Sequence, residues 1–271
     1  MALLLSALGG TTLLLPTQPP PLPLSLAPSH AHRAHLLMLN PIDASLQPVE
    51  APPEGPWGIK EVSPDGKLVQ KVEGMTRKTW KFNDISKDRV QVALTSEGRP
   101  VTADIQLWIG PNWAPFNVKA YTEDGKARPV QTLVGTRNKA VTIEIRNTNE
   151  YEFPFYAASN YAKGAMAELP VDIPAKTTGV KVDGGNLKSF PLDPMTEQLE
   201  VVLKTDGRQL NARIELLSGP NNPKQTYQVF TQNGLLNSLC VAFNTPDAGT
   251  TVRIVNLGTV EFPFNIHLLE N

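Results

Sequence analysis

The chain has 271 residues, with 25 Lys or Arg and 26 Asp or Glu, so its formal net charge at pH 7 is −1. This balance excludes the strongly basic surface of a nucleic-acid-binding protein and leaves little charge to keep copies of the chain apart. The single cysteine, Cys240, excludes an intrachain disulfide, and no Cys/His cluster has the spacing of a zinc site. No apolar run approaches the length of a membrane-spanning helix, so no membrane insertion is expected.

The N-terminal part of the chain differs in composition from the rest. Residues 2–15 are short and apolar and end before Pro16, which is typical of a signal-peptide core. The following stretch, up to residue 42, contains no acid and many Ser and Pro residues, which is typical of a plastid transit peptide. We therefore predict a two-part targeting leader over residues 1–42 and a Pro-rich, flexible or extended lead-in over residues 43–75.

An internal repeat is the most informative feature of the sequence. Residues 90–155 align with residues 199–264 without a gap, and we count 20 identities in these 66 positions. The identities include a Gly-Pro-Asn block at residues 110–112 and 219–221 and a Glu-Phe-Pro-Phe (EFPF) block at the end of each copy. We interpret the repeat as two copies of one structural unit.

Each copy has the residue pattern of a β-domain. Apolar residues alternate with polar ones, as in Val90–Leu94 and Val101–Leu107, and Asp-Gly or Asn-Gly pairs favour tight hairpins between the runs. Strands are expected near residues 90–94, 101–107, 116–122, 130–134, 140–146, 226–231, 239–243 and 250–255. The predicted fold class is all-β, with two tandem, internally duplicated β-sandwich-like units in a pseudo-two-fold relation.

The repeat also predicts the domain boundaries. The first β-sandwich repeat is expected over residues 76–159 and the second over residues 191–271, joined by a connecting segment over residues 160–190. This segment is too long for a turn and is expected to pack over a sandwich edge or to cross between the units. Two arrangements stay open, namely two independent sandwiches or one shared core with exchanged strands.

The EFPF blocks are the first candidates for a role in structure or assembly. Two Phe residues two positions apart are expected to share a strand face, and the Pro between them lacks the N–H that full pairing requires. The strand is therefore expected at an edge or a bulge, either as a hydrophobic plug or as a contact surface toward another subunit. The residues concerned are Glu152, Phe153, Pro154, Phe155, Glu261, Phe262, Pro263 and Phe264.

Two tryptophans and one histidine complete the candidate residues. Trp108 and Trp113 flank the first Gly-Pro-Asn block, where core packing, a protein interface and stacking on a sugar are the three interpretations. His267 stands alone outside the leader and is interpreted as a surface or interface residue, and Cys240 as a small buried hydrophobe. The residues contain no catalytic constellation, so no catalytic residue, no cofactor and no metal site is predicted.

The two repeats resemble a known family. The segments ADIQLWIGPNWAPFNVKAYTEDG and LNARIELLSGPNNPKQTYQVFTQNG, each followed by an EFPF block, are similar to the pyrenoid shell proteins of diatoms and related algae. The resemblance runs from about Lys78 to the C-terminus. It implies a non-enzymatic protein that assembles with itself into a sheet around the Rubisco-filled pyrenoid of the plastid stroma and supports carbon dioxide concentration. Rubisco and pyrenoid matrix proteins are further candidate partners.

Two other functions compete with that of a self-assembling shell. A soluble β-sandwich module that binds a carbohydrate or another ligand would use Trp108 and Trp113. An enzyme such as a carbonic anhydrase is poorly supported, because a catalytic zinc ion needs about three protein ligands. For a shell protein, edge strands are expected to carry the contacts, by strand addition or side-chain packing. Residues 265–271 are expected to form a free C-terminal arm, whose deletion would weaken assembly without unfolding the protein.

Overall fold

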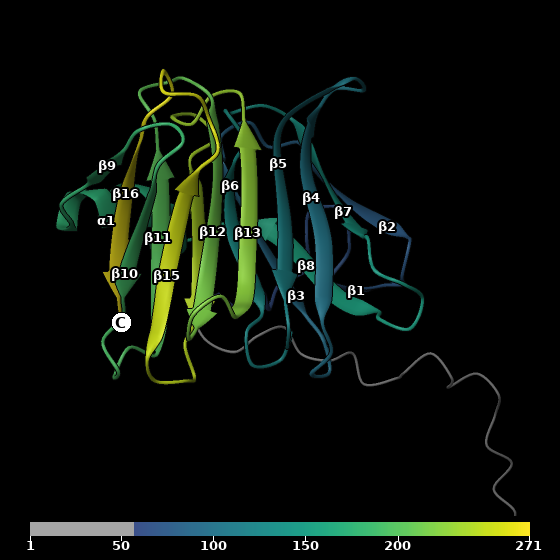
Figure 1. The fold of residues 1–271 in the computed structure, drawn as a ribbon. Coiled ribbons are helices and arrows are strands. Elements are labelled where there is room, and N and C mark those ends of the chain that lie inside the picture. The colour runs from purple at the N-terminus through teal and green to yellow at the C-terminus, as the bar shows by residue number, and fades with distance from the viewer. Residues whose placement is uncertain (1–56) are drawn as a thin grey trace, which may run out of the picture. The chain divides into compact units, whose positions relative to one another are not determined.

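The alternating residue pattern produces a structure built almost wholly from antiparallel strands (Figure 1). The structure, a computed structural model, describes residues 57–271. The predicted leader and the first part of the predicted lead-in therefore lie outside the described residues. Two eight-stranded sheets pack face to face as a β-sandwich, which confirms the predicted all-β class.

Each sheet combines strands from both halves of the chain. In spatial order, sheet A consists of β1 (Val69–Val72), β8 (Phe155–Tyr161), β3 (Arg89–Thr95), β6 (Val130–Gly135), β14 (Leu239–Asn244), β11 (Gln198–Lys204), β16 (Phe264–Glu270) and β9 (Val180–Val182). Sheet B consists of β10 (Leu187–Pro191), β15 (Thr250–Asn256), β12 (Leu210–Ser218), β13 (Pro223–Thr231), β5 (Trp113–Thr122), β4 (Val101–Ile109), β7 (Val141–Asn147) and β2 (Arg77–Phe82).

The strand order is symmetric about the middle of each sheet. Adding eight to the number of a strand in the first half gives the strand at the mirrored position in the second half. Lys119 pairs with Gln228 at the centre of sheet B, and Thr132 pairs with Val241 at the centre of sheet A. In both pairs the two partners occupy equivalent positions of the two repeats. The halves are thus arranged as by a two-fold rotation about an axis perpendicular to the sheets. A duplicated origin of the halves remains a prediction from the sequence.

The two halves share one hydrophobic core. Strands β5 and β13 pair in sheet B and β6 and β14 pair in sheet A, so both sheets run unbroken from one half to the other. One buried cluster accordingly includes Val92 and Ile105 from the first half and Val201 and Ile214 from the second. Each half contributes four neighbouring strands to each sheet, so the structure has a shared core without interleaved strands.

A buried tyrosine links the two sheets where the halves meet. The hydroxyl of Tyr227 in β13 accepts a hydrogen bond of 3.0 Å from the backbone N–H of Gln131 in β6 and donates one of 3.3 Å to the carbonyl of Ala242 in β14. Complete burial raises the pKa of Tyr227, so its hydroxyl keeps its proton.

Sheet A is covered on its outer face by the short helix α1 (Ala165–Lys176) and by the segment that begins at Trp57. Met166 and Ile173 of the helix pack in a cluster with Trp57, and the Trp57 indole N–H donates a 3.1 Å hydrogen bond to the buried carboxylate of Glu200. The sequence did not predict this helix, because Pro170 and Pro174 lie inside it. No helix among residues 57–271 is long and apolar enough to cross a membrane.

The short and terminal strands differ from the expectations. The eight expected strands correspond to β3, β4, β5, β6, β7, β13, β14 and β15, whereas the lead-in contributes β1 and the connecting segment contains α1, β9 and most of β10. The prediction of a free C-terminal arm was wrong. Residues 264–270 form β16, which pairs with β11 on one side and β9 on the other, and the side chain of Ile266 is buried.

Deletion of residues 265–271 is therefore expected to unfold the sandwich. It removes a strand from inside sheet A, exposes apolar surface of the core and leaves β9 without a partner. We expect a loss of at least about 4 kcal/mol in the free energy of unfolding or no cooperative transition at all, measured by urea denaturation. The exposed substitution Asn265→Ala in the same strand serves as the control. An unchanged transition in the truncated chain would contradict the position of β16.

Candidate assembly surfaces

The loops that connect the strands gather at two opposite ends of the sandwich. We call the end at the top of Figure 1 the head end; it carries residues 83–88, 110–112, 136–140, 183–186, 205–209, 232–238 and 257–263. The tail end carries residues 73–76, 96–100, 123–129, 148–154, 192–197, 219–222 and 245–249. The candidate residues from the sequence lie in several of these loops and in the strands beside them.

The EFPF blocks form equivalent corners in the two halves, and the expectation of an edge strand or a bulge was wrong. Pro154 and Pro263 precede β8 and β16, so their missing N–H groups fall in the loops and leave the strands free to pair on both sides. Phe155 and Phe264 are buried at the start of these strands. Phe153 and Phe262 lie in the loops and are half-buried, so the paired phenylalanines do not share a strand face.

A buried asparagine fixes each of these corners. The side-chain amide of Asn147 donates hydrogen bonds of 3.1 and 2.8 Å to the carbonyls of Val72 and Phe153. Asn256, its equivalent in the second repeat, donates bonds of 3.1 and 2.9 Å to the carbonyls of Val182 and Phe262. These bonds satisfy backbone carbonyls that burial removes from water.

An exposed arginine completes the same corner in each half. Arg99 donates a 2.7 Å hydrogen bond to the carbonyl of Glu152, and Arg208 donates a 2.8 Å bond to the carbonyl of Glu261. The side chains of both glutamates are exposed, so the matched contacts use their backbone alone. The identities between the two repeats at these positions therefore have a structural reason.

The residue before each EFPF block is an exposed apolar side chain. Tyr151 and Val260 occupy equivalent positions of the two repeats, and each is 75 % exposed. The two corners lie near opposite edges of the sandwich, because β8 and β16 are the second strands from opposite edges of sheet A. Sequence reasoning missed both residues, although their place beside a repeated motif was visible.

The two tryptophans have different surroundings. Trp108 in β4 is half-buried, and its indole N–H is buried without a hydrogen-bond partner among the described residues. Trp113 at the start of β5 is 36 % exposed and donates a 3.0 Å hydrogen bond to the side chain of Gln232 in the other half. The guanidinium of Arg137 and the ammonium of Lys139 lie 5.3 and 5.9 Å from the centre of its ring. Trp113 therefore belongs to a basic and aromatic surface at the head end.

His267 is half-buried in β16, against the segment that follows α1. Its Nδ1 lies 3.2 Å from the hydroxyl of Thr177, and the backbone of Gly179 lies so close that an added Cβ would approach the imidazole to 2.7 Å. Burial lowers the pKa of His267 below 6.5, the bond to Thr177 opposes this shift, and Lys204 lowers the pKa further. A role of His267 at an interface remains a prediction.

The described residues carry no arrangement that suggests catalysis. Within residues 57–271 no group of three His, Cys, Asp or Glu side chains is placed to hold a metal ion. Cys240 is fully buried, and burial raises the pKa of its thiol, which disfavours the reactive thiolate.

Asn147→Ala is expected to lower the free energy of unfolding by about 1–3 kcal/mol, because two backbone carbonyls lose their donor. Asn256→Ala is expected to cause a similar loss in the other half. The control Asn265→Ala, at an exposed position, should change stability by less than about 0.5 kcal/mol. Urea denaturation measures all three, and equal stability of all variants would show that the corners do not depend on these amides.

The lowered pKa of His267 predicts a loss of stability below about pH 6.5. In this range the unfolded chain binds the proton more readily than the folded protein, so the contribution of His267 is complete above about pH 6.5 and is lost as the pH decreases toward the folded-state pKa. The melting temperature of His267→Gln should decrease less than that of the unaltered protein between pH 7 and pH 5. An equal decrease in the melting temperatures of His267→Gln and the unaltered protein over this pH range would contradict the prediction.

Comparison with known proteins gives the family of the chain. No curated protein matches it. A family model described as diatom pyrenoid shell protein matches residues 63–270, which are 208 of the 271 residues and include every strand of both sheets. The chain therefore belongs to the family of diatom pyrenoid shell proteins.

Proposed function

We propose that the protein is a non-enzymatic building block that assembles with itself into a sheet-like shell around the Rubisco-containing pyrenoid. The shell lies in the plastid stroma, at the pyrenoid periphery, and supports carbon dioxide concentration and fixation. The family supports this function, and the described residues carry recognition features without a candidate catalytic site. Copies of the chain are the main partners, with Rubisco and pyrenoid matrix proteins as further candidates.

The observation that carries the proposal is the pair of equivalent corners near opposite edges of the sandwich. Each corner presents an exposed apolar side chain, Tyr151 or Val260, on a loop held rigid by a buried asparagine. A subunit with two separate contact sites can bind a neighbour on each side, and such contacts propagate when they do not close into a ring. Exposed apolar groups on rigid loops favour association because little conformational entropy is lost on binding.

Electron microscopy of the purified protein tests the function. We expect extended sheets in wild-type preparations, and solitary particles at all protein and salt concentrations would contradict the proposal. Tyr151→Ser combined with Val260→Ser should abolish the sheets and leave the circular dichroism spectrum unchanged, because both side chains are exposed. The control combines Val62→Ser with Ile85→Ser, two positions that are also exposed and apolar. Sheets of normal appearance in the corner variant would exclude these corners as contacts.

A soluble carbohydrate-binding module is the alternative, and it rests on Trp113. The ring of Trp113 lies beside two cations, and its N–H is already bonded to Gln232, so the geometry favours a protein contact over a sugar platform. Binding on a glycan array that Trp113→Ala abolishes would support the alternative.

A further inference from the structure

The two ends of the sandwich have similar backbones and different charges. The loops of the tail end carry nine acidic and three basic residues, whereas those of the head end carry five acidic and four basic residues. The two-fold arrangement places equivalent loops at opposite ends, so this difference lies in the side chains alone. Charge therefore gives a nearly symmetric fold two distinct ends.

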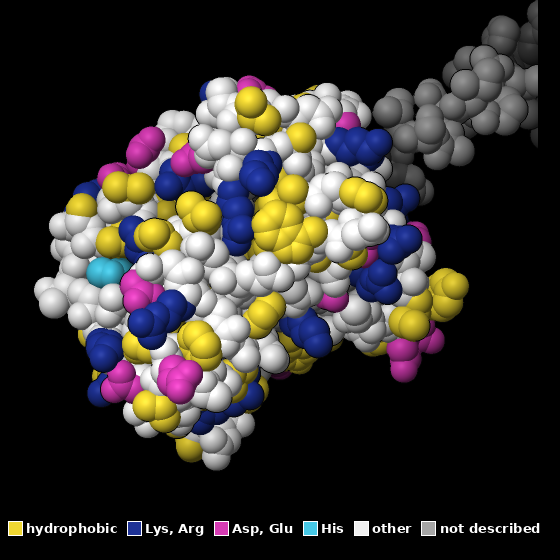
Figure 2. Space-filling model, turned by 90° about the horizontal axis from the view of Figure 1, so that it is seen from above, with side chains coloured by type: hydrophobic (Ala, Val, Ile, Leu, Met, Phe, Trp, Pro, Cys, Tyr) yellow, Lys and Arg dark blue, Asp and Glu magenta, His cyan; other side chains and the backbone are white. Residues whose placement is uncertain are grey.

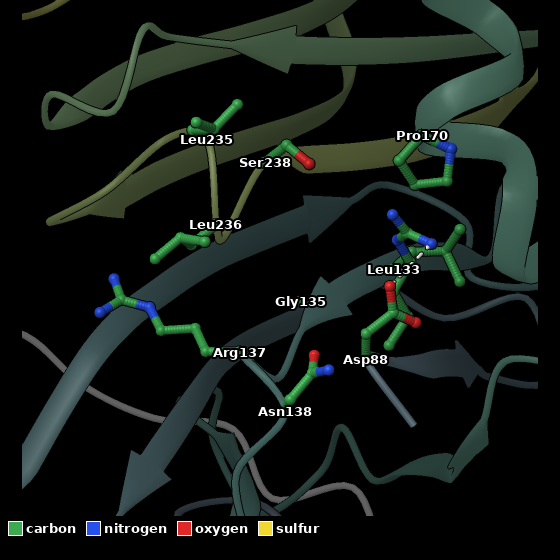
Figure 3. A pocket seen from close by; sticks show the side chains of 10 residues that line it. Asp88, Leu133, Gly135, Arg137, Asn138, Pro170, Leu235, Leu236 and Ser238 are labelled. Atoms are coloured by element: carbon green, nitrogen blue, oxygen red, sulfur yellow. Dashed lines mark ion pairs between the residues drawn. The ribbon is translucent and has the colours of Figure 1, made fainter. Parts of the chain in front are cut away.

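The contrast is greatest where the halves meet. At the head end, Trp113, Arg137, Lys139, Leu235 and Leu236 form a surface that we call the head seam. Figure 2, which views this end, shows Lys and Arg side chains beside hydrophobic ones near its middle, and Figure 3 shows Arg137 and Leu236 from the two halves at one small pocket. Within residues 57–271, neither Arg137 nor Lys139 has a carboxylate partner.

The equivalent surface at the tail end has a different chemistry. Pro194, Met195, Glu197, Pro246 and Ala248 line a depression of about 520 Å³, which we call the tail seam. Met195 is 84 % exposed, and the side chains of Glu197 and the neighbouring Asp193 form no ion pair within the described part of the chain. The alignment of the two repeats places Pro246 and Ala248 where the head seam has Arg137 and Lys139. Continued to residue 84, it places Asp193 and Glu197 where the head end has Asp84 and Asp88, so the two seams differ mainly in their basic residues.

The edges of the sandwich are unsuited to direct strand addition between copies. The edge strands β1, β2, β9 and β10 carry Lys71, Arg77, Lys78, Lys81, Lys181 and Lys188 and no acidic residue. Lys71, Arg77 and Lys181 are paired with nearby carboxylates, whereas Lys78, Lys81 and Lys188 form no ion pair within the described part of the chain. Lysines on edge strands are a pattern that protects sheet edges from aggregation. The expectation that strand addition carries the contacts has no support from these charges.

We infer that the head seam of one copy docks onto the tail seam of a second copy, so that copies join in polar rows. Arg137 and Lys139 would face Asp193 and Glu197, while the exposed leucines and Trp113 cover Met195 and the prolines. In a head-to-head contact, Asp84 and Asp88 would take the places of Asp193 and Glu197, but Asp88 is already paired with Arg89. The head loops 83–88 and 136–140 together carry one net positive charge, and the equivalent tail loops 192–197 and 245–249 carry three net negative charges. Net charge therefore favours the head-to-tail contact over the head-to-head one. The inference rests on the proposed self-assembly and names one of its contacts.

Charge reversal on each seam tests the contact. The head variant combines Arg137→Glu with Lys139→Glu, and the tail variant combines Asp193→Lys with Glu197→Lys. The control combines Lys60→Glu with Lys119→Glu, which makes the same charge change as the head variant at exposed positions away from both seams. Circular dichroism and thermal melting establish that each variant is folded. We expect each seam variant to raise the concentration required for assembly about tenfold or more, while the control assembles as the unaltered protein does.

The two seam variants together distinguish the head-to-tail contact from a symmetric one. A head-to-head contact would be disturbed by the head variant alone and a tail-to-tail contact by the tail variant alone, whereas the head-to-tail contact requires both seams. An equimolar mixture of the two variants should assemble again in the analytical ultracentrifuge, because each charged seam then finds a complementary one. A chain that carries all four substitutions should also assemble, because its two seams have exchanged their charges.

Three results would overturn the inference. One is normal assembly of either folded seam variant, another is a mixture that stays monomeric, and the third is a folded four-substitution chain that does not assemble. Each would show that the charges of the two seams do not meet across a contact between copies.

The same measurements separate this inference from the proposed function. The unaltered protein could form rows but no sheets, and both seam variants could fail to form these rows. This result would support the head-to-tail contact and contradict the proposed shell. Sheets from the folded head variant at the normal concentration would leave the shell intact and overturn the contact, and would assign the head seam to another partner.

Discussion

Pairing of equivalent strands at the middle of the sandwich is the interaction on which the rest of the structure depends. Strands β5 and β13 join the halves in one sheet and β6 and β14 join them in the other. Each half alone would end in two strands with unpaired backbone groups and would expose the side of its core. Joining the halves satisfies those groups and merges two small cores into one, which buries a larger share of apolar surface. Tyr227 adds hydrogen bonds across both sheets at this junction.

The junction also explains how one chain can be symmetric in backbone and asymmetric in surface. Antiparallel pairing of equivalent strands places the first half upside down relative to the second. Loops that correspond in sequence therefore face opposite ends, where different side chains meet different surroundings. At the head seam the halves are bridged by Trp113 with Gln232 and by Arg137 with Asn237, whereas at the tail the bridges are the ion pairs Arg128–Asp247 and Lys224–Glu123. As a result, Arg137 and Lys139 are left without carboxylates within the described part of the chain.

The repeated EFPF blocks combine a structural role with exposure. Asn147, Asn256 and two arginines hold the carbonyls of these corners, which accounts for the identities between the repeats without any role in binding. Tyr151 and Val260, which differ between the repeats at the position before each block, are both exposed. Residues shared by the two repeats thus maintain the shape of the corner, and Tyr151 and Val260 beside them are exposed at its surface.

The sequence by itself determined the repeat, the period-two strands, the family resemblance and the scarcity of histidine and cysteine. These are local or compositional properties, because alternation along a strand reports which side faces the core. It did not identify β1 and β9, which are too short to show a period, or α1, whose prolines hide a helix that is stabilised by packing on sheet A. Only the tertiary structure decided that the halves share one core, that β16 is an inner strand, and that Arg137 and Lys139 lie beside Trp113. Each of these facts depends on contacts between residues far apart in the chain, and the alternation within a strand does not specify its partner.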